Sequence, residues 1–303
     1  MHADQDLEQT IILTDMDGCY IDDRTAKDDL SRDAYDAAIE AEIPISFVTG
    51  KSAALALLDI RRLDNPFPLI AENGSVIYVP EDFLSRSELE EHEEFRPWLA
   101  DEERVEDNAT YNLLEYNIGV DETTRFLHEL QKELPFEIRL YTEMSPQELG
   151  RDVGYDLELA KLDQMKEYHL PVKIGTEFGG FDDDEEKIAR FKQELEDAGY
   201  TWSRGRYHLV GKGRDNNEVS KEEACKALKQ MYEIKYPQGV FTVGLGDSQS
   251  DHGMEEWADK GYQVAKPKGH VELPENSSII RVDGTGPEGW AMAINALLEG
   301  KPL

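Results

Sequence analysis

Two short acidic motifs, far apart in the chain, each follow an apolar run that is typical of a β-strand. The first, Asp15-Met16-Asp17-Gly18, comes directly after residues 11–14, and the second, which holds Asp247 and Asp251, comes after residues 242–246. In parallel α/β sheets the functional groups gather outside the carboxyl ends of the strands. The chain is therefore predicted to fold around a parallel sheet that brings both motifs to one edge.

The two outer parts of the chain show the alternation of apolar runs and helical stretches that a parallel sheet requires. In the first part, strands are expected over 7–14, 43–49 and 68–71, with helices over 26–41 and 52–63. In the last part, strands are expected over 240–245, 261–265 and 279–282, with helices over 220–234, 251–260 and 288–298. We expect the two parts to be halves of one sheet, in an α/β domain made of residues 1–81 and 211–303.

The middle of the chain has a different pattern. Strands are expected there over 111–118, 136–141, 172–175 and 207–210, with helices over 122–134 and 184–198. The charge-rich segment 82–107 is expected at the surface, and the acids of 182–186 are expected in the first turn of the last helix, where the dipole favours them. Residues 82–210 are thus predicted to form a smaller α+β domain inserted into the first.

The composition limits the classes of partner. A chain of 303 residues with 39% hydrophobic residues can bury a substantial core. The formal net charge of -33, from 65 acidic and 32 basic residues, argues against a nucleic acid or an anionic membrane as partner. We interpret this charge as a strongly solvated surface. Adaptation to a high-salt habitat is one hypothesis, which predicts that unfolding midpoints rise between low and molar salt.

The cysteine content and the N-terminal sequence bear on the compartment. Cys19 and Cys225 are the only cysteines, which does not make a disulfide framework and fits a reducing compartment. Residues 1–10 are polar and acidic, and no apolar run approaches the length needed to cross a bilayer. We expect a soluble cytoplasmic protein, and the sequence leaves both a monomer and a dimer open.

The spacing of Asp15 and Asp17 suits a particular chemistry. Two residues apart on an extended chain, their carboxylates lie on the same side and address one substrate atom. One can attack phosphorus while the other gives a proton to the leaving oxygen and later takes one from water. The alternative is a polar turn after a strand, in which Asp and Gly are common.

The second motif supplies further carboxylates. Mg²⁺ prefers one or two carboxylates together with phosphate oxygens and waters, and Asp15 with Asp247 provides that pair. Asp251 either supports the metal site or caps the helix that follows it.

Two more positions complete the predicted site. Thr49 and Gly50 end the second strand and precede a helix, where a hydroxyl and backbone N–H groups form a seat for a phosphoryl oxygen. An ordinary helix N-cap is the alternative. Lys221, in the first turn of a helix where acids are usually favoured, is the expected cation for the phosphoryl charge. A solvated surface lysine is the alternative for Lys221, and Lys212 is the second candidate for the role.

These elements, in this order, resemble the haloacid-dehalogenase-like (HAD) superfamily of Mg²⁺-dependent phosphatases. The resemblance covers both outer parts and implies a Rossmann-like core, with the inserted α+β domain as a type-two (C2) cap. Three further segments are similar to the mannosyl-3-phosphoglycerate phosphatase family: residues 68–74, residues 205–208 and Gly286-Pro287-Glu288-Gly289-Trp290. Members of that family convert mannosyl-3-phosphoglycerate to the compatible solute mannosylglycerate and phosphate.

The resemblance implies a role for each matching residue. Asp15 is the expected nucleophile, Asp17 the general acid/base, and Thr49, Gly50 and Lys221 the phosphate ligands. The expected metal ligands are Asp15, the Asp17 carbonyl and Asp247, with Asp251 in support. The expected substrate contacts are Glu72 and Asn73 from the core and Arg206 and His208 from the cap.

The sequence also departs from the family pattern. Cys19 stands where Thr or Ser is usual, Ser250 stands where Asn is common, and Tyr207 and His208 are adjacent where one residue often intervenes. Phosphatases of glucosyl-3-phosphoglycerate or sucrose phosphate therefore remain open. So do a phosphomutase and, from another class, a non-catalytic protein that binds sugar phosphates.

Overall fold

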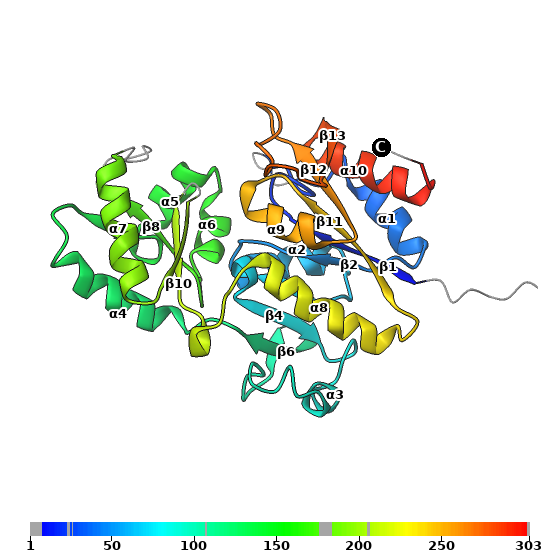
Figure 1. Ribbon diagram of the computed structural model, residues 1–303, viewed down its shortest axis with the longest axis horizontal. Coiled ribbons are helices and arrows are strands. Elements are labelled where there is room, and N and C mark those ends of the chain that lie inside the picture. Colours follow the sequence, from blue (N-terminus) through cyan, green and yellow to red (C-terminus); the bar gives the residue numbers. More distant parts are fainter. Residues whose placement is uncertain are drawn as a thin grey trace, which may run out of the picture.

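The computed structural model describes residues 8–22, 25, 27–106, 108–175, 184–204 and 207–301. They form two lobes that lie side by side (Figure 1). The larger lobe, here called the core, contains the first and last strands, and the smaller lobe, here called the cap, is inserted between them in sequence.

The core is built on a parallel sheet with the first strand in its middle. The strand order is β13-β12-β11-β1-β2, with bounds Gln9–Thr14 for β1, Ile45–Phe47 for β2, Val240–Gly246 for β11, Lys260–Ala265 for β12 and Ile280–Thr285 for β13. Thr14 of β1 lies opposite Leu245 of β11 and Phe47 of β2. The two ends of the chain therefore form one sheet, as predicted, and both acidic motifs leave it at the same edge.

Helices cover both faces of this sheet, because its strands are apolar on both sides. They are α1 (Arg32–Glu40), α2 (Ala53–Arg62), α8 (Lys221–Lys235), α9 (His252–Trp257) and α10 (Gly286–Leu298). Ile12 packs in one cluster with α1, α2 and α10, whereas Ile11 and Leu13 pack with α8 and α9. Neighbouring residues of β1 thus point to opposite faces, as a strand requires.

An antiparallel sheet extends the core beyond β2. Its order is β3-β4-β6-β5, and the bounds are Leu69–Ala71 for β3, Val76–Pro80 for β4, Arg104–Glu106 for β5 and Ala109–Glu115 for β6. A parallel bridge between Val48 and Ile70 joins it to the parallel sheet. The short helix α3 (Arg86–Glu91) lies between β4 and β5 in the chain, and Figure 1 shows it beside β6.

The position of β5 and β6 bears on where the cap begins. The sequence predicts residues 82–117 in the inserted domain, but β6 pairs along its length with β4, and β5 pairs with β6. The sequence prediction does not include strand β4, so it does not anticipate this antiparallel pairing. We propose that the core consists of residues 8–117 and 212–301 and the cap of residues 118–211.

The cap is an α+β unit, as predicted. Its antiparallel sheet has the order β7-β8-β10-β9, with bounds Ile138–Leu140 for β7, Leu170–Ile174 for β8, Thr201–Arg204 for β9 and His208–Gly211 for β10. Its helices are α4 (Val120–Gln131), α5 (Pro146–Val153), α6 (Leu157–Asp163) and α7 (Glu185–Asp197). Helices α4 and α7 pack on one face of the sheet with Val172 and Val210. Helices α5 and α6, which the sequence does not predict, lie with Tyr141 and Tyr207 in a separate cluster.

The chain enters and leaves the cap at neighbouring points. Asn117 and Gly213 form an antiparallel bridge, and the N–H of Ile118 donates to the carbonyl of Lys212 at 2.9 Å.

Short 3-10 segments occur at Glu72–Gly74, Tyr141–Glu143, Arg214–Asn216 and Gln249–Asp251.

Within the described residues, no helix combines the length and the apolar character that a transmembrane span requires.

Candidate active site

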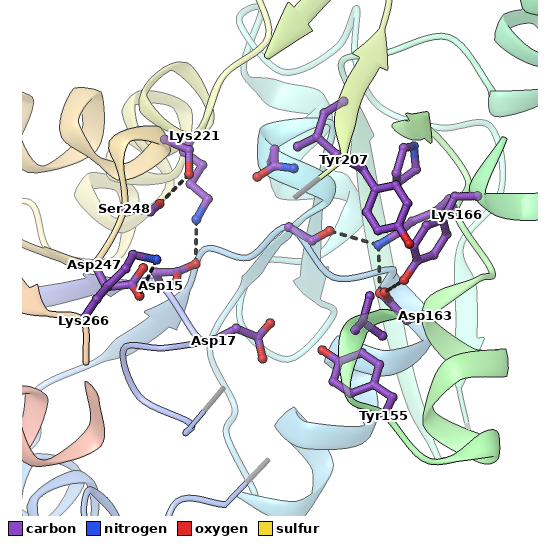
Figure 2. Close-up of a pocket in the computed structure, with 17 residues that line it drawn as sticks. Asp15, Asp17, Tyr155, Asp163, Lys166, Tyr207, Lys221, Asp247, Ser248 and Lys266 are labelled. Carbon is purple, nitrogen blue, oxygen red and sulfur yellow. Dashed lines mark hydrogen bonds and ion pairs between the residues drawn. The ribbon is translucent and has the colours of Figure 1, made fainter. Parts of the chain in front are cut away.

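A pocket of about 390 Å³ lies between the edge of the parallel sheet and the cap (Figure 2). The core contributes Asp15, Asp17, Gly50, Asn73, Lys221, Asp247, Ser248, Ser250 and Lys266. The cap contributes Tyr141, Val153, Tyr155, Asp163, Lys166, Pro171, Tyr207 and Leu209. The structure thus brings residues from both acidic motifs to one cavity with the helix-start lysine.

Lys221 connects the two acidic motifs. Its Nζ lies 2.6 Å from Oδ1 of Asp15 and 2.6 Å from Oδ1 of Asp251, and its side chain is 4% exposed. Ser220 caps α8 by accepting from the N–H of Glu223, which fixes the start of the helix. Burial alone disfavours the ammonium charge, but the two carboxylates outweigh burial and raise the pKa of Lys221. Lys221 is therefore a positive charge held inside the site and not a solvated surface lysine.

Asp251 uses its two carboxylate oxygens differently. Oδ1 faces Lys221, while Oδ2 accepts from the backbone N–H of Ser248 at 3.0 Å. Burial raises the pKa of Asp251, but Lys221 and Ser248 together lower it by more than burial raises it, so the net shift is downward. Asp251 thus closes the turn that carries Asp247 and adds a negative charge to the site. Its side chain makes no cap hydrogen bond to α9, so the helix-cap alternative is not met, and its support of a metal stays a prediction.

Three buried carboxylates are close enough to share a cation. Asp15, Asp247 and Asp251 each offer an oxygen, and these oxygens lie within 4.8 Å of one another. Burial raises the pKa of Asp15; Lys221 opposes this rise, and the charges of Asp251 and Asp247 add to it. Hard oxygen ligands with an excess of negative charge are the donor set that suits Mg²⁺. Lys266 also reaches this group, with its Nζ 3.0 Å from Oδ2 of Asp247.

Asp17 lines the same pocket on a tight loop. Gly18 has a φ of +75°, and the N–H of Ile21 donates to the carbonyl of Met16 at 2.7 Å, which turns the chain back after the motif. The Asp17 side chain is 31% exposed, and its Oδ1 lies 2.9 Å from Nζ of the buried Lys51. In Figure 2 it lies between the Asp15 and Lys221 group and the side chains of the cap.

The loop after β2 provides part of the pocket wall. Gly50 lines the pocket, and a Cβ at this position would lie 3.1 Å from both amide atoms of Asn73, so the close approach favours glycine. Thr49 is buried, and its Oγ1 accepts from the N–H of Lys51 at 3.1 Å. Ser52, not Thr49, caps α2 by accepting from Leu55. The helix-cap alternative for Thr49 is thereby removed, and its phosphate-binding role stays a prediction.

The cap is bonded directly to this loop. Oδ1 of Asp163 accepts from the N–H of Ser52 at 3.1 Å and from Nζ of Lys166 at 2.8 Å. Lys166 also donates to the carbonyl of Gly50 at 3.1 Å, and the hydroxyl of Tyr141 donates to Asp163. Burial raises the pKa of Asp163, but Lys166 and these hydrogen bonds outweigh burial and lower it. The cap wall of the pocket is thus anchored by an ionised aspartate.

Glu72 holds the cap in a second place. It is fully buried, and its carboxylate accepts from the backbone N–H groups of Glu167, Tyr168 and His169 at 2.8 to 2.9 Å. Burial raises its pKa against the effects of Lys166 and the three N–H donors. The predicted substrate contact at Glu72 is therefore corrected to an anchor between core and cap, whereas Asn73 does line the pocket.

Of the two predicted substrate contacts from the cap, His208 needs correction. His208 stacks on Trp202 with ring centroids 5.6 Å apart and lies beside Phe191 of α7, on the helix-covered face of the cap sheet. Its neighbours Tyr207 and Leu209 line the pocket instead, because successive strand residues face opposite sides. Arg206 lies outside the described residues.

Other pocket residues have no counterpart in the sequence prediction. They include Lys166, Asp163 and Lys266, together with the aromatic Tyr141 and Tyr155. No local motif marks them, since their chemistry depends on partners far away in the chain. Lys212, the second candidate for the cation, instead donates to the carbonyl of Ala198 at 3.2 Å within the cap.

Comparisons with known proteins agree with this geometry. Residues 12–273 match the family model of haloacid dehalogenase-like hydrolases. A glucosyl-3-phosphoglycerate/mannosyl-3-phosphoglycerate phosphatase of Methanococcoides burtonii is 30% identical, with 95% of this chain and 97% of the relative covered. A protein of the same name from Persephonella marina is 24% identical, with 95% and 97% covered.

Among solved structures, a haloacid dehalogenase-like hydrolase from B. subtilis has a TM-score of 0.59 at 17% identity. The match covers 95% of this chain and 99% of that one, and it supports the fold alone. From the family match over most of its length and the 30% identity to a curated phosphatase, the chain belongs to the haloacid dehalogenase-like hydrolases, as a phosphatase of the branch that contains mannosyl-3-phosphoglycerate phosphatase.

Proposed function

We propose that this protein is a Mg²⁺-dependent phosphomonoester hydrolase that acts on a phosphorylated sugar-glycerate, with mannosyl-3-phosphoglycerate as its preferred substrate. The products are mannosylglycerate and inorganic phosphate. The observation that carries the proposal is the ammonium group of Lys221 held 2.6 Å from both Asp15 and Asp251, inside a pocket that Asp17 also lines. The two curated relatives act, by their names, on glycosylated phosphoglycerates.

The reaction proceeds in two phosphoryl transfers. A carboxylate oxygen of Asp15 attacks phosphorus, the bond from phosphorus to the substrate oxygen breaks, and Asp17 gives a proton to that oxygen. Asp17 then takes a proton from water, which attacks the phosphorus of the aspartyl phosphate and releases phosphate and free Asp15. Lys221 neutralises charge on the phosphoryl group throughout.

The carboxylates of Asp15, Asp247 and Asp251, with the carbonyl of Asp17, would hold the metal. Bound there, Mg²⁺ supplies positive charge that offsets the repulsion between the Asp15 carboxylate and the phosphate dianion. Gly50 and Thr49 present the loop that would receive a phosphoryl oxygen, at the carboxyl end of the strand next to β1.

The cap wall is suited to a sugar that carries an anionic group. Tyr141, Tyr155 and Tyr207 give it aromatic surface on which a sugar ring can lie, and Lys166 gives it a positive charge. Lys166, Tyr155 and Tyr207 lie across the pocket from Asp15 and Lys221 (Figure 2), so the cap selects the organic part of the substrate while the core carries out the chemistry.

Phosphate release from a panel of substrates tests the proposal. The full chain is assayed with mannosyl- and glucosyl-3-phosphoglycerate, sucrose phosphate and simple sugar phosphates, in Mg²⁺ and in EDTA. We expect the highest kcat/KM on mannosyl-3-phosphoglycerate, no turnover in EDTA, and recovery with Mg²⁺. A higher value on glucosyl-3-phosphoglycerate or sucrose phosphate would reassign the substrate, and activity that survives chelation would contradict the metal assignment.

Asp15→Asn is the control for the reaction class. We expect it to fold and to lose turnover by several orders of magnitude, because the nucleophile acts as a unit with the other site residues. Ligand binding without phosphate release by the unaltered protein would indicate a sugar-phosphate-binding protein, and an isomerised sugar phosphate would indicate a mutase.

A further inference from the structure

Lys51 forms a buried ion-pair chain that ends on Asp17. Its Nζ lies 2.9 Å from Oδ1 of Asp17 and 2.8 Å from Oδ2 of Asp59. The Lys51 side chain is 5% exposed and that of Asp59 is 9% exposed. Burial alone disfavours the charge, but both carboxylates outweigh it and raise the pKa of Lys51. A buried positive charge, itself held by the buried carboxylate of Asp59, therefore contacts the partly exposed side chain of Asp17.

The backbone around Lys51 is fixed from several sides. Its N–H donates to Oγ1 of Thr49 at 3.1 Å, and its carbonyl accepts from the N–H of Glu72 at 3.2 Å. Asp59 stands on α2, which begins immediately after Ser52, and Arg62 contacts Asp59 at 3.5 Å. The ammonium group of Lys51 therefore has a defined position against which the Asp17 carboxylate is held.

The direction of the Asp17 carboxyl group matters for proton transfer. A general acid must lie within hydrogen-bond reach of the oxygen that it protonates, and a misplacement of about 1 Å costs as much as 10²-fold in rate. Asp17 stands between the nucleophile and the cap, where the leaving oxygen of a bound substrate would be (Figure 2). An ion pair to Oδ1 therefore orients the Asp17 carboxyl group.

We propose that Lys51 is a positioning residue that aims Asp17 at the leaving oxygen, and that Asp59 in turn holds Lys51. The inference rests on the proposed role of Asp17 as the general acid. Lys51 keeps its own protons throughout: the proton that reaches the leaving oxygen comes from Asp17 as the bond to phosphorus breaks. Loss of Lys51 leaves that proton available but places its donor wrongly.

Substrates with different leaving groups separate positioning from a general structural role. The alkoxide leaving group of a sugar-glycerate phosphate needs a proton, whereas the phenolate that leaves p-nitrophenyl phosphate does not. The readout is kcat/KM, which covers only the steps up to departure of the leaving group. The later attack of water, which also uses Asp17, therefore does not obscure it.

We expect Lys51→Met to lower kcat/KM for the alkyl substrate about 10²-fold and for p-nitrophenyl phosphate less than about 10-fold. Lys51→Arg should recover most of the alkyl activity, because it restores a cation that reaches Asp17. Asp59→Asn should also lower kcat/KM more for the alkyl substrate than for p-nitrophenyl phosphate, but by a smaller factor. Arg62→Met is the matched control: it removes a cation that touches Asp59 but not Asp17, and both substrates should keep their kcat/KM.

Equal losses on both substrates in Lys51→Met would overturn the inference and assign Lys51 a structural role. Circular dichroism and thermal unfolding show whether that variant folds. If it does not, the test relies on Lys51→Arg and Asp59→Asn, and equal losses of kcat/KM on both substrates in Asp59→Asn overturn the inference. Asp17→Asn tests the underlying assumption. If Asp17→Asn lowers kcat/KM equally for the alkyl substrate and for p-nitrophenyl phosphate, Asp17 is not the general acid. If Asp17→Asn lowers it more for the alkyl substrate but Lys51→Met does not, only the positioning role of Lys51 is refuted.

Discussion

The indole N–H of Trp290 donates a hydrogen bond of 2.9 Å to Oγ1 of Thr14, the residue that immediately precedes Asp15. The Thr14 hydroxyl also donates to the carbonyl of Asp15 at 3.0 Å. Trp290 is fully buried and meets the ring of Tyr20 edge-on at 5.0 Å. The C-terminal helix thus supports the loop that carries Asp15, the proposed nucleophile, which gives the motif of residues 286–290 a physical role.

Replacing Trp290 tests this support. We expect Trp290→Phe to lower the free energy of unfolding by about 1 to 3 kcal/mol, because a buried hydrogen bond and part of a packed ring are lost. It should also lower kcat while KM changes little, since the displaced loop bears Asp15. Urea unfolding and steady-state kinetics measure both effects. Trp98→Phe, remote from the pocket, is the control and should keep kcat; an unchanged kcat in Trp290→Phe would contradict the supporting role.

Mg²⁺ should stabilise the chelator-treated protein, because a ligand that binds only the folded state shifts the unfolding equilibrium. The gain reaches about 2.7 kcal/mol at a concentration about 100 times Kd. Asp247→Asn should lose this gain. Lys266→Met should tighten Mg²⁺ binding, since the ammonium group 3.0 Å from Asp247 competes with the metal for that carboxylate. Thermal unfolding in titrated Mg²⁺ gives Kd for each protein, and a weaker Kd in Lys266→Met would refute this competition.

Glu255 on α9 should make the protein less stable as pH rises. Among the described residues neither of its carboxylate oxygens has a hydrogen-bond partner, and burial, followed by the charge of Asp251, raises its pKa to about 10. Its ordinary pKa is 4.5, so the folded state keeps a proton that the unfolded state releases. The stability that this proton confers is complete below about pH 4.5 and falls as pH rises towards 10, by at most about 1.4 kcal/mol per pH unit.

Glu255→Gln should therefore flatten the decline in the free energy of unfolding between pH 6 and 9, the range that denaturant titrations would cover. Glu256→Gln is the neighbouring control. Glu256 accepts from Ser278, and its pKa is lowered, so its removal should leave the alkaline decline in place. Identical slopes in the unaltered protein and Glu255→Gln would show that Glu255 is ionised when buried.

Tyr207, just before β10, and His208, its first residue, should differ in their effect on substrate binding. Tyr207→Leu should raise KM for the sugar-glycerate substrate severalfold and hardly change p-nitrophenyl phosphate hydrolysis, since Tyr207 lines the cap side of the pocket. His208→Phe should change the stability of the cap but not KM, because His208 packs on Trp202. A rise in KM in His208→Phe alone would restore the original prediction for His208.

The parallel sheet and the meeting of its acidic motifs are predictable because they depend on local patterns. An apolar run followed by Asp marks both β1 and β11, and pairing of parallel strands then fixes where their ends lie. The helix-start position of Lys221 is local in the same way. Sequence patterns of this kind carry the core of the fold and the central group of the site.

The features that the sequence does not predict depend on partners far away in the chain, or on which of two adjacent residues faces the pocket. Tyr207 and His208 are adjacent, and nothing local decides which of them faces the pocket. The chain from Asp17 through Lys51 to Asp59 joins the ends of two strands and a helix, so no single segment displays it. Glu255 has the chemistry of a surface residue, and only the packing of α9 against the sheet buries it.

The hydrogen-bonded neighbours Asn117 and Gly213 mark both crossings between the lobes. Since the polypeptide departs and returns at adjoining points, the whole of 118–211 can be exchanged for another module, or for a tight turn, without re-threading a single strand of the hydrolytic lobe. A different module at this place could therefore present other side chains to the substrate while the strand order of the core stays the same.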